Sequence, residues 1–210
     1  MRLHLYAGTE VTVLLGAMYW AVLVPQDKPR TEGGKLSSQN FEIVGIALGR
    51  SEVEDLDRVL GRRTFPDTPS PEREGMQSCY CSPGNDRTVL QFDTWIGTVV
   101  EFHFFQGSRR LVSRCTKSRR ISGSLATASG VGLGMSRREA IALLGKPANS
   151  GEDLLRYELD FNRSPTPEEL KQFRDAFVEP PALINIHGYI KLSFRNKRVV
   201  RVDALRNEDW

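Results

Sequence analysis

The stretch GIALGRSEVEDLDRVLG at residues 45–61 and the stretch GVGLGMSRREAIALLG at residues 130–145 follow one pattern. Each has the order Gly-x-x-Leu-Gly-x-Ser-x-x-Glu, followed by an apolar helical face and a Leu-Gly ending. Internal repetition of this kind indicates that one supersecondary unit occurs more than once in the chain. We therefore expect two similar units in tandem.

Both copies contain the signals of a short capped helix. Ser51 with Glu54, and Ser136 with Glu139, have the spacing of a capping box, in which each side chain accepts a hydrogen bond from the other residue's backbone N–H. Apolar residues follow at helical spacing, and a glycine closes each segment as a C-terminal cap. We predict one helix after Ser51 and one after Ser136.

After each helix the hydrophobic period becomes alternating, which is typical of strands with one buried face. The strands that this pattern predicts lie at residues 77–82, 88–93, 99–105, 111–116, 154–161, 189–194 and 199–205. The predicted fold class is α+β, with two tandem units that each pack a short helix on an antiparallel sheet of three to four strands. The units are expected at 41–122 and 123–210, and Thr166 with Glu169 indicates a helical insertion at 166–178 in the second.

Residues 1–40 are expected to be a signal or anchor segment with a polar spacer. Val11–Val24 is a run of 14 uncharged, mostly apolar residues. As a helix it would rise about 21 Å, short of the roughly 30 Å hydrocarbon core of a bilayer, so it is more typical of a signal h-region or N-terminal anchor than of a membrane span. We expect an extracytoplasmic protein, periplasmic or held at a membrane by its N-terminus. The alternative is a buried hairpin at the start of a cytoplasmic protein.

The three cysteines favour the same compartment. Cys79 and Cys81 alternate around Tyr80, so on a strand both side chains point to one side. A disulfide from Cys115 to either of them fits an oxidising compartment and leaves one thiol over. Buried free thiols are the alternative. Cys-x-Cys without a nearby histidine is poor zinc spacing, so we expect no metal site and no cofactor.

The residues that could support catalysis form no specific pattern. Gly130, Gly132 and Gly134 have neither the spacing of a dinucleotide loop nor the Lys-Ser/Thr of a phosphate-binding loop. Only three histidines exist, and none can be combined with a nucleophile in a specific arrangement. A small hydrolase or ligand-binding protein that uses His103 and nearby carboxylates is the weakest interpretation. We expect no enzymatic activity.

A run of basic residues is the first candidate for partner binding. Residues 109–120 contain no acidic residue. The basic residues of this run are Arg109, Arg110, Arg114, Lys117, Arg119 and Arg120. Such a run can meet an acidic protein or an anionic membrane surface. Nucleic acid is not expected, because few aromatic residues interleave the basic ones. The alternative is a solvated edge strand whose charges prevent sheet-to-sheet association.

The polar faces of the predicted sheets are the second candidate. Placed side by side, they would form one broad solvent-exposed surface that carries Gln91, Asp93, Glu101, His103, Arg156, Glu158, Lys191, Arg201 and Asp203. Charges of both signs mix on this surface, which suits recognition of a protein better than non-specific binding of anions. The alternative is a face that is polar only because it is solvated.

The helix phrases resemble a known family. Gly130–Pro147, with its Leu-Gly-x-Pro ending and the strands after it, is similar to the small module of the outer-membrane assembly lipoproteins called SmpA or BamE. The tandem form, over roughly residues 41–205, is similar to the β-lactamase inhibitor proteins. The chain departs from the pattern at Arg63, where proline is expected, in its second-unit insertion and in having no lipobox cysteine. The resemblance implies a non-enzymatic, extracytoplasmic module and transfers no partner-binding residue.

The sequence thus predicts a non-catalytic, extracytoplasmic protein-binding or scaffolding module that recognises a partner protein through its sheet face. The alternative is a structural accessory subunit of a larger envelope or membrane-associated complex, docked by the apolar N-terminus and the basic run.

Overall fold

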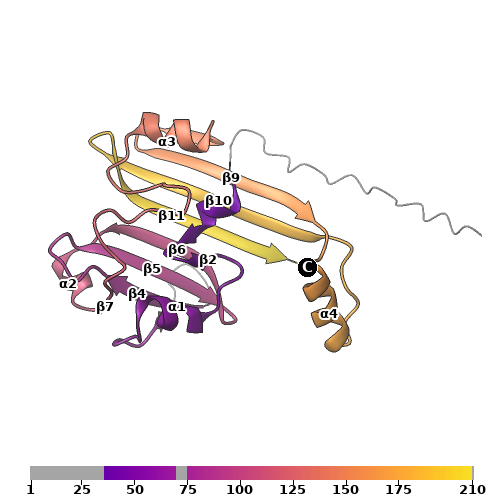
Figure 1. Cartoon of the computed structure of the whole chain (residues 1–210). Coiled ribbons are helices and arrows are strands. Elements are labelled where there is room, and N and C mark those ends of the chain that lie inside the picture. The colour runs from indigo at the N-terminus through magenta and orange to yellow at the C-terminus, as the bar shows by residue number, and fades with distance from the viewer. Residues whose placement is uncertain (1–35, 70–74, 210) are drawn as a thin grey trace, which may run out of the picture.

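The computed structural model describes residues 36–69 and 75–209 (Figure 1). The expected signal or anchor segment, and most of the spacer after it, lie outside these residues. The described part forms a nine-stranded sheet, a two-stranded sheet and several short helices. None of these helices is both long enough and apolar enough to cross a membrane.

The large sheet is antiparallel except where its ninth strand joins. In spatial order its strands are β3 (Thr68–Pro69), β4 (Met76–Cys81), β5 (Thr88–Trp95), β6 (Thr98–Gln106), β11 (Arg198–Asp209), β10 (Ile184–Arg195), β9 (Leu154–Arg163) and β8 (Asn149–Gly151). The ninth strand, β7 (Thr116–Lys117), pairs in parallel with β4. The other elements are η1 (Ser38–Phe41), β1 (Glu42–Ile43), β2 (Ile46–Ala47), α1 (Val53–Leu60), α2 (Arg109–Val112), α3 (Arg137–Leu144) and α4 (Pro167–Asp175).

The prediction of two helix-on-sheet units is wrong, because the two groups of strands form one continuous sheet. β6 of the unit expected at 41–122 pairs antiparallel with β11 of the unit expected at 123–210, from Glu101 opposite Leu205 to Phe105 opposite Arg201. Buried residues of both halves belong to one hydrophobic cluster. The pairing satisfies backbone groups of two strands that would otherwise be open edges.

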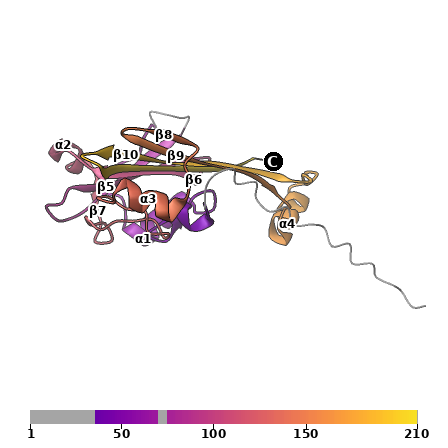
Figure 2. The ribbon, with the colours of Figure 1, turned by 90° about the horizontal axis from the view of Figure 1, so that it is seen from above.

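The helices α1 and α3 cover the same face of this sheet (Figure 2). Leu56 and Leu60 of α1, and Ala140 and Leu144 of α3, are buried in the hydrophobic cluster. The strand residues beneath them are apolar over most of the sheet, as in the cross-strand row Phe92, Phe102, Ala204, Ile190 and Tyr157. The opposite face, called the polar face below, therefore carries the charged residues.

The capping boxes have different outcomes. Ser136 with Glu139 caps α3, and Thr166 with Glu169 caps α4, as their spacing predicts. At α1 the box expected from Ser51 and Glu54 is wrong, because Glu52 is the N-cap residue and pairs with Asp55. The Ser51 hydroxyl accepts a hydrogen bond from the backbone N–H of Ala47 instead.

The strand expected at 111–116 is also wrong, since α2 and a turn occupy most of that segment. The Ser108 side chain caps α2 by accepting a hydrogen bond from the backbone N–H of Leu111. Only Thr116 and Lys117 extend as a strand, β7. The basic run is therefore not a single edge strand.

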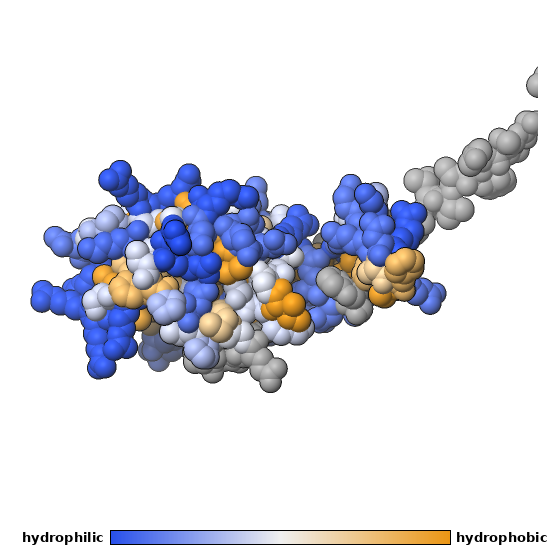
Figure 3. Space-filling model, turned by 90° about the horizontal axis from the view of Figure 1, so that it is seen from below, coloured by the Kyte–Doolittle hydropathy of each residue, from blue (hydrophilic) through white to orange (hydrophobic). Residues whose placement is uncertain are grey.

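α4 lies within the expected insertion 166–178 and is fastened to the sheet by Arg163 of β9. The Arg163 guanidinium binds Glu169 of α4 and Glu208 of β11. Beyond α4 the apolar side chains of Phe177, Val178 and Leu183 are exposed. Figure 3 shows an apolar patch at this end of the molecule.

Candidate functional site

Cross-strand rows of side chains build the polar face. In an antiparallel sheet, residues directly opposite each other place their side chains on one face and within contact distance. The central row runs from β4 to β9 and contains Cys79, Gln91, His103, Asp203, Lys191 and Arg156. One flanking row contains Gln77, Asp93, Glu101, Leu205, Tyr189 and Glu158; the other contains Cys81, Val89, Phe105, Arg201, Ser193 and Leu154.

His103 lies at the centre of these rows, among three carboxylates. Its Nδ1 is 2.7 Å from Asp203 Oδ1, and its Nε2 is 3.0 Å from Asp93 Oδ2 and 3.8 Å from Glu101 Oε1. All four residues are buried. An imidazole ring with a carboxylate at each nitrogen can donate on both sides only when it is protonated.

The electrostatics of the cluster agree with a charged ring. Burial lowers the pKa of His103, but the hydrogen bonds to Asp203 and Asp93 outweigh burial and raise this pKa to about 9. Burial raises the pKa of Asp203, and the hydrogen bond with His103 and the charge of Arg201 lower it below its ordinary value. At neutral pH His103 is therefore an imidazolium and Asp203 a carboxylate.

Two further cations complete the cluster around Asp203. Arg201 Nε donates to Asp203 Oδ1 at 2.6 Å, and Lys191 Nζ lies 3.7 Å from Oδ2. Within the described residues, the carboxylates of Asp93, Glu101 and Asp203 thus face the cations of His103, Arg201 and Lys191. Three carboxyl groups are thus matched by three basic side chains, and the pairing offsets the cost of burying the carboxyl groups.

Polar side chains of the flanking row orient the other two carboxylates. The Tyr189 hydroxyl donates to Glu101 Oε1. The side-chain amide of Gln77 donates to Asp93 Oδ1 at 3.0 Å. These contacts fix the carboxylates around His103.

Asp93, Glu101 and His103 offer ligand atoms that all lie within 4.8 Å of one another. One imidazole and two carboxylates are donors that suit zinc and related metals. To bind a metal, His103 would have to lose its proton. The divalent cation would also add charge to a group that is already balanced. The residues therefore fit an ion-pair cluster, in which the imidazolium takes the place of a cation, better than a metal centre.

The acidic and basic side chains of the polar face differ in their exposure to solvent. The side chains of Asp93, Glu101 and Asp203 are at most 2% exposed, whereas Lys191 is 42% exposed and Arg201 37%. The broad exposed surface expected from the sequence is wrong at Asp93, Glu101, His103 and Asp203. These residues are buried because neighbouring strands, some of them distant in the chain, bring their partners together. Arg156, Lys191 and Arg201 do reach the solvent.

Aromatic rings hold the two arginines in place. The Arg156 guanidinium lies 4.7 Å from the centroid of the Tyr189 ring, and the Arg201 guanidinium lies 5.1 Å from that of Phe105. Arg156 Nε also donates to Glu158 Oε1 at 3.0 Å. A guanidinium stacked on a ring keeps its N–H edge free for a further partner.

The basic run lies at one end of the polar face. Leu111 and Val112 of α2 pack against a small cluster that contains Cys81 and Val89, which belong to a flanking row of that face. All six basic side chains of the run are exposed, and no ion pair in the described part of the chain includes any of them. Hydrophilic side chains project at this end in Figure 3.

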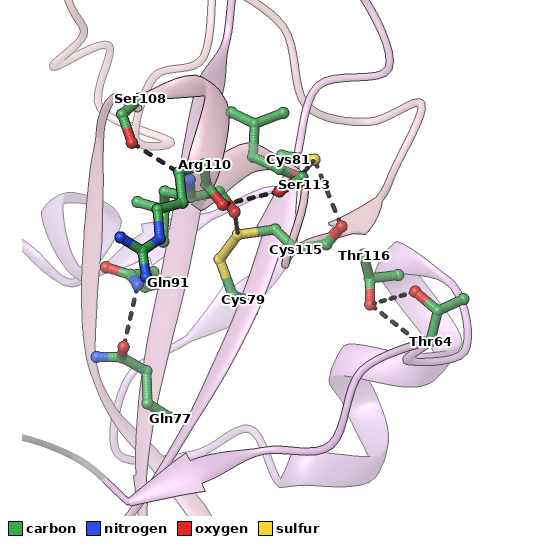
Figure 4. The surroundings of a disulfide bond; sticks show 12 residues. Thr64, Gln77, Cys79, Cys81, Gln91, Ser108, Arg110, Ser113, Cys115 and Thr116 are labelled. Carbon is green, nitrogen blue, oxygen red and sulfur yellow. Dashed lines mark hydrogen bonds between the residues drawn. A yellow bond between two sulfur atoms is a disulfide. The ribbon is translucent and has the colours of Figure 1, made fainter.

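A disulfide fastens the segment after α2 to the sheet (Figure 4). Cys115 is bonded to Cys79, and Cys81 carries the free thiol. The Cys81 thiol is buried beneath α2, 3.6 Å from the carbonyl oxygen of Val112, and burial raises its pKa. Of the two pairings left open by the sequence, the structure has the one through Cys79.

Comparison of the chain with protein-family models, with curated proteins and with solved structures finds no match. The resemblance to the SmpA or BamE module therefore stays a prediction.

Three members of the site were not among the residues named from the sequence. Tyr189 stacks on Arg156 and donates to Glu101, Phe105 stacks on Arg201, and Gln77 orients Asp93. Alternation in the strands could have placed all three on the polar face, since each is two residues from a residue of the central row.

Proposed function

We propose that this protein is a non-catalytic, extracytoplasmic binding module that recognises a partner protein through the polar face of its sheet. The supporting observation is the layering of that face. His103 and three carboxylates are buried at its centre, and the partly exposed cations Arg156 and Arg201, each stacked on an aromatic ring, lie beside them. A surface that is ordered before binding loses less conformational entropy when a partner docks.

The state of His103 supports a role without catalysis. A general base must be unprotonated and able to reach a substrate proton near the operating pH. His103 has a pKa of about 9 and is buried, with a carboxylate at each ring nitrogen. These properties stabilise the sheet and do not suit proton abstraction, so the hydrolase interpretation is the least favoured.

The disulfide supports an extracytoplasmic location. Disulfides persist in oxidising environments and are rare in reducing cytosol. The bond between Cys79 and Cys115 therefore favours the periplasm or another extracytoplasmic space. The resemblance of Gly130–Pro147 to the SmpA or BamE module points to the same class of protein.

A second candidate function is that of an accessory subunit docked to a larger envelope complex through the basic run. The observation that favours it is the exposure of all six basic side chains at the α2 end, without ion pairs among the described residues. This surface adjoins the polar face, so one experiment can compare the two.

Site-specific photo-cross-linking in cells that express the full chain tests both functions. A photoreactive amino acid is placed singly at Lys191 on the polar face, at Arg119 in the basic run and at Ala142 in α3, on the opposite side of the sheet. We expect a discrete protein adduct from the Lys191 position and none from Ala142. An adduct only from Arg119 would favour the accessory subunit, and equal labelling from all three positions would contradict a specific sheet-face interface.

A further inference from the structure

We propose that the polar face selects an acidic partner: a carboxylate-bearing segment of a protein docks on the partly exposed cations Arg156, Lys191 and Arg201. This inference rests on the proposed function and names the chemistry of its partner.

The number of cations around Asp203 is the first argument. Its Oδ1 serves both His103 Nδ1, at 2.7 Å, and Arg201 Nε, at 2.6 Å. Lys191 Nζ approaches Oδ2 only to 3.7 Å. One carboxylate therefore lies among three cations, and two of these, Lys191 and Arg201, are partly exposed to solvent.

The donors left over at the surface are the second argument. A guanidinium has five N–H groups and an ammonium three. Arg201 uses Nε on Asp203, and its Nη2 lies 3.3 Å from Nδ1 of the positively charged His103. A second carboxylate placed above Arg201 and Lys191 would reduce the repulsion between these neighbouring cations and use their free donors.

The different burial of the carboxylates and the cations determines which charge the polar face presents to solvent. The carboxylates that balance the cluster are covered, so an approaching molecule first meets the cations of Lys191 and Arg201. Of the acidic residues in the three rows, Glu158 is the one with an exposed side chain, and it is paired with Arg156. Within these three rows the formal charges are thus balanced in total but mostly positive at the surface, which is complementary to an acidic partner. In the row beyond Glu158, the exposed Asp160 lies 3.3 Å from His187.

The spacing of the cations fits a small anionic group. Lys191 is directly opposite Asp203, and Arg201 is two residues before Asp203 on β11. Neighbouring strands are about 4.8 Å apart, so the head groups of Lys191 and Arg201 can contact the same carboxylate. The stacking of Arg156 and Arg201 on rings fixes their planes, which favours a directed carboxylate contact over the diffuse attraction of a lipid surface.

Fluorescence anisotropy with a fluorescein-labelled oligo-glutamate peptide tests the proposal on the full chain. We expect saturable binding that weakens as ionic strength rises. The double variant Arg156→Gln/Lys191→Gln should raise Kd about tenfold or more, which corresponds to roughly 1.4 kcal/mol. Circular dichroism and a thermal melt show whether the double variant remains folded. If the double variant unfolds, the single variant Lys191→Gln is used in its place.

Matched variants separate this face from general charge effects. Arg138→Gln/Lys146→Gln removes two exposed charges at α3 on the other side of the sheet, and Arg119→Gln/Arg120→Gln removes two from the basic run. Both should bind the peptide nearly as the unmodified chain does. An oligo-lysine peptide should bind more weakly than oligo-glutamate.

Four results would overturn the inference: equal loss in all three double variants, loss confined to the basic-run variant, tighter binding of oligo-lysine, or no binding of oligo-glutamate. The chain can also be tested with vesicles that contain anionic lipid. Tighter binding to the vesicles than to the peptide, dependent on Arg156 and Lys191, would contradict an acidic protein as the partner. A protein cross-link from the Lys191 position would still support partner binding by the sheet face, even where the peptide experiment rejects an acidic partner. The two proposals can therefore fail separately.

Discussion

His103 Nδ1 lies 2.7 Å from Asp203 Oδ1, although the two residues are 100 positions apart in the sequence. They are directly opposite each other on β6 and β11, the two strands that join the first and second halves of the sheet. The bond therefore ties the two halves together at a buried position. Because its donor ring is charged at neutral pH, the strength of this junction depends on pH.

We predict that the free energy of unfolding falls as the pH rises from 6.5 to about 9. The pKa of His103 is raised from 6.5 to about 9 in the folded chain. A raised pKa stabilises the folded state fully below the unfolded value and ceases to do so above the folded one. The expected loss is roughly 3 kcal/mol. Urea unfolding at a series of pH values measures it.

The variant His103→Gln serves as the control for this titration. It lacks the ionisable ring, so its stability should change less over the same pH window. The difference between the two curves isolates His103 from Cys81 and from other groups that titrate at high pH. Parallel curves for the two chains would show that His103 is not the group responsible.

Loss of the disulfide is expected to destabilise the chain by about 4 kcal/mol, the entropic cost of closing a loop of its length. Cys79 and Cys115 are separated by 36 positions. Reduction should lower the free energy of unfolding of the unmodified chain and leave that of Cys79→Ala/Cys115→Ala unchanged. The variant Cys81→Ala should remain sensitive to reduction. Insensitivity of that variant would mean that Cys81, and not Cys79, is bonded to Cys115.

The substitution Gly188→Ala should destabilise the fold by about 1–3 kcal/mol, the usual cost of inserting a methyl group into packed structure. A Cβ at Gly188 would lie 2.7 Å from the carbonyl oxygen of Leu205 and 3.2 Å from Phe41 Cε1. Relief would require β10 to move from β11 or from the aromatic ring. Thermal or urea unfolding of the variant measures the cost.

Gly151→Ala is the matched control, because its nearest neighbour would be Leu154 Cβ at 3.8 Å, an ordinary contact. It should change stability by no more than about 0.5 kcal/mol. Equal effects of the two substitutions would contradict the close approach at Gly188.

Local structure in this chain could be predicted from sequence where the determining residues are neighbours. Ser136 and Glu139 are three positions apart and do cap α3. Alternation located the strands that include residues 88–93 and 199–205. The segment 111–116 was misassigned because its composition suits a strand. The Ser108 cap and the packing of Leu111 and Val112 on the cluster of Cys81, Val89 and Cys115 favour a helical turn instead.

The arrangement of the strands and the depth of the site could not be predicted in this way. Alternation shows that Glu101 and His103 share a face of β6. Their burial depends on Asp203 and on other residues brought by β10 and β11, nearly 100 positions further along the chain. The pairing of β6 with β11 likewise could not be predicted from alternation. The same pattern is expected whether each strand is paired on both sides or lies at the edge of a separate sheet.

Cleavage of the chain between its halves tests this junction, and we expect the two fragments to stay together. A protease site inserted at the exposed residues Ser122–Ser124 lies between β7 and α3. The disulfide lies within the first fragment, so it cannot hold the second. Pairing of β6 with β11 and the shared hydrophobic cluster should keep the cleaved fragments in one peak on gel filtration, and denaturant should separate them. Two fragments that elute separately in native buffer would instead indicate independent units.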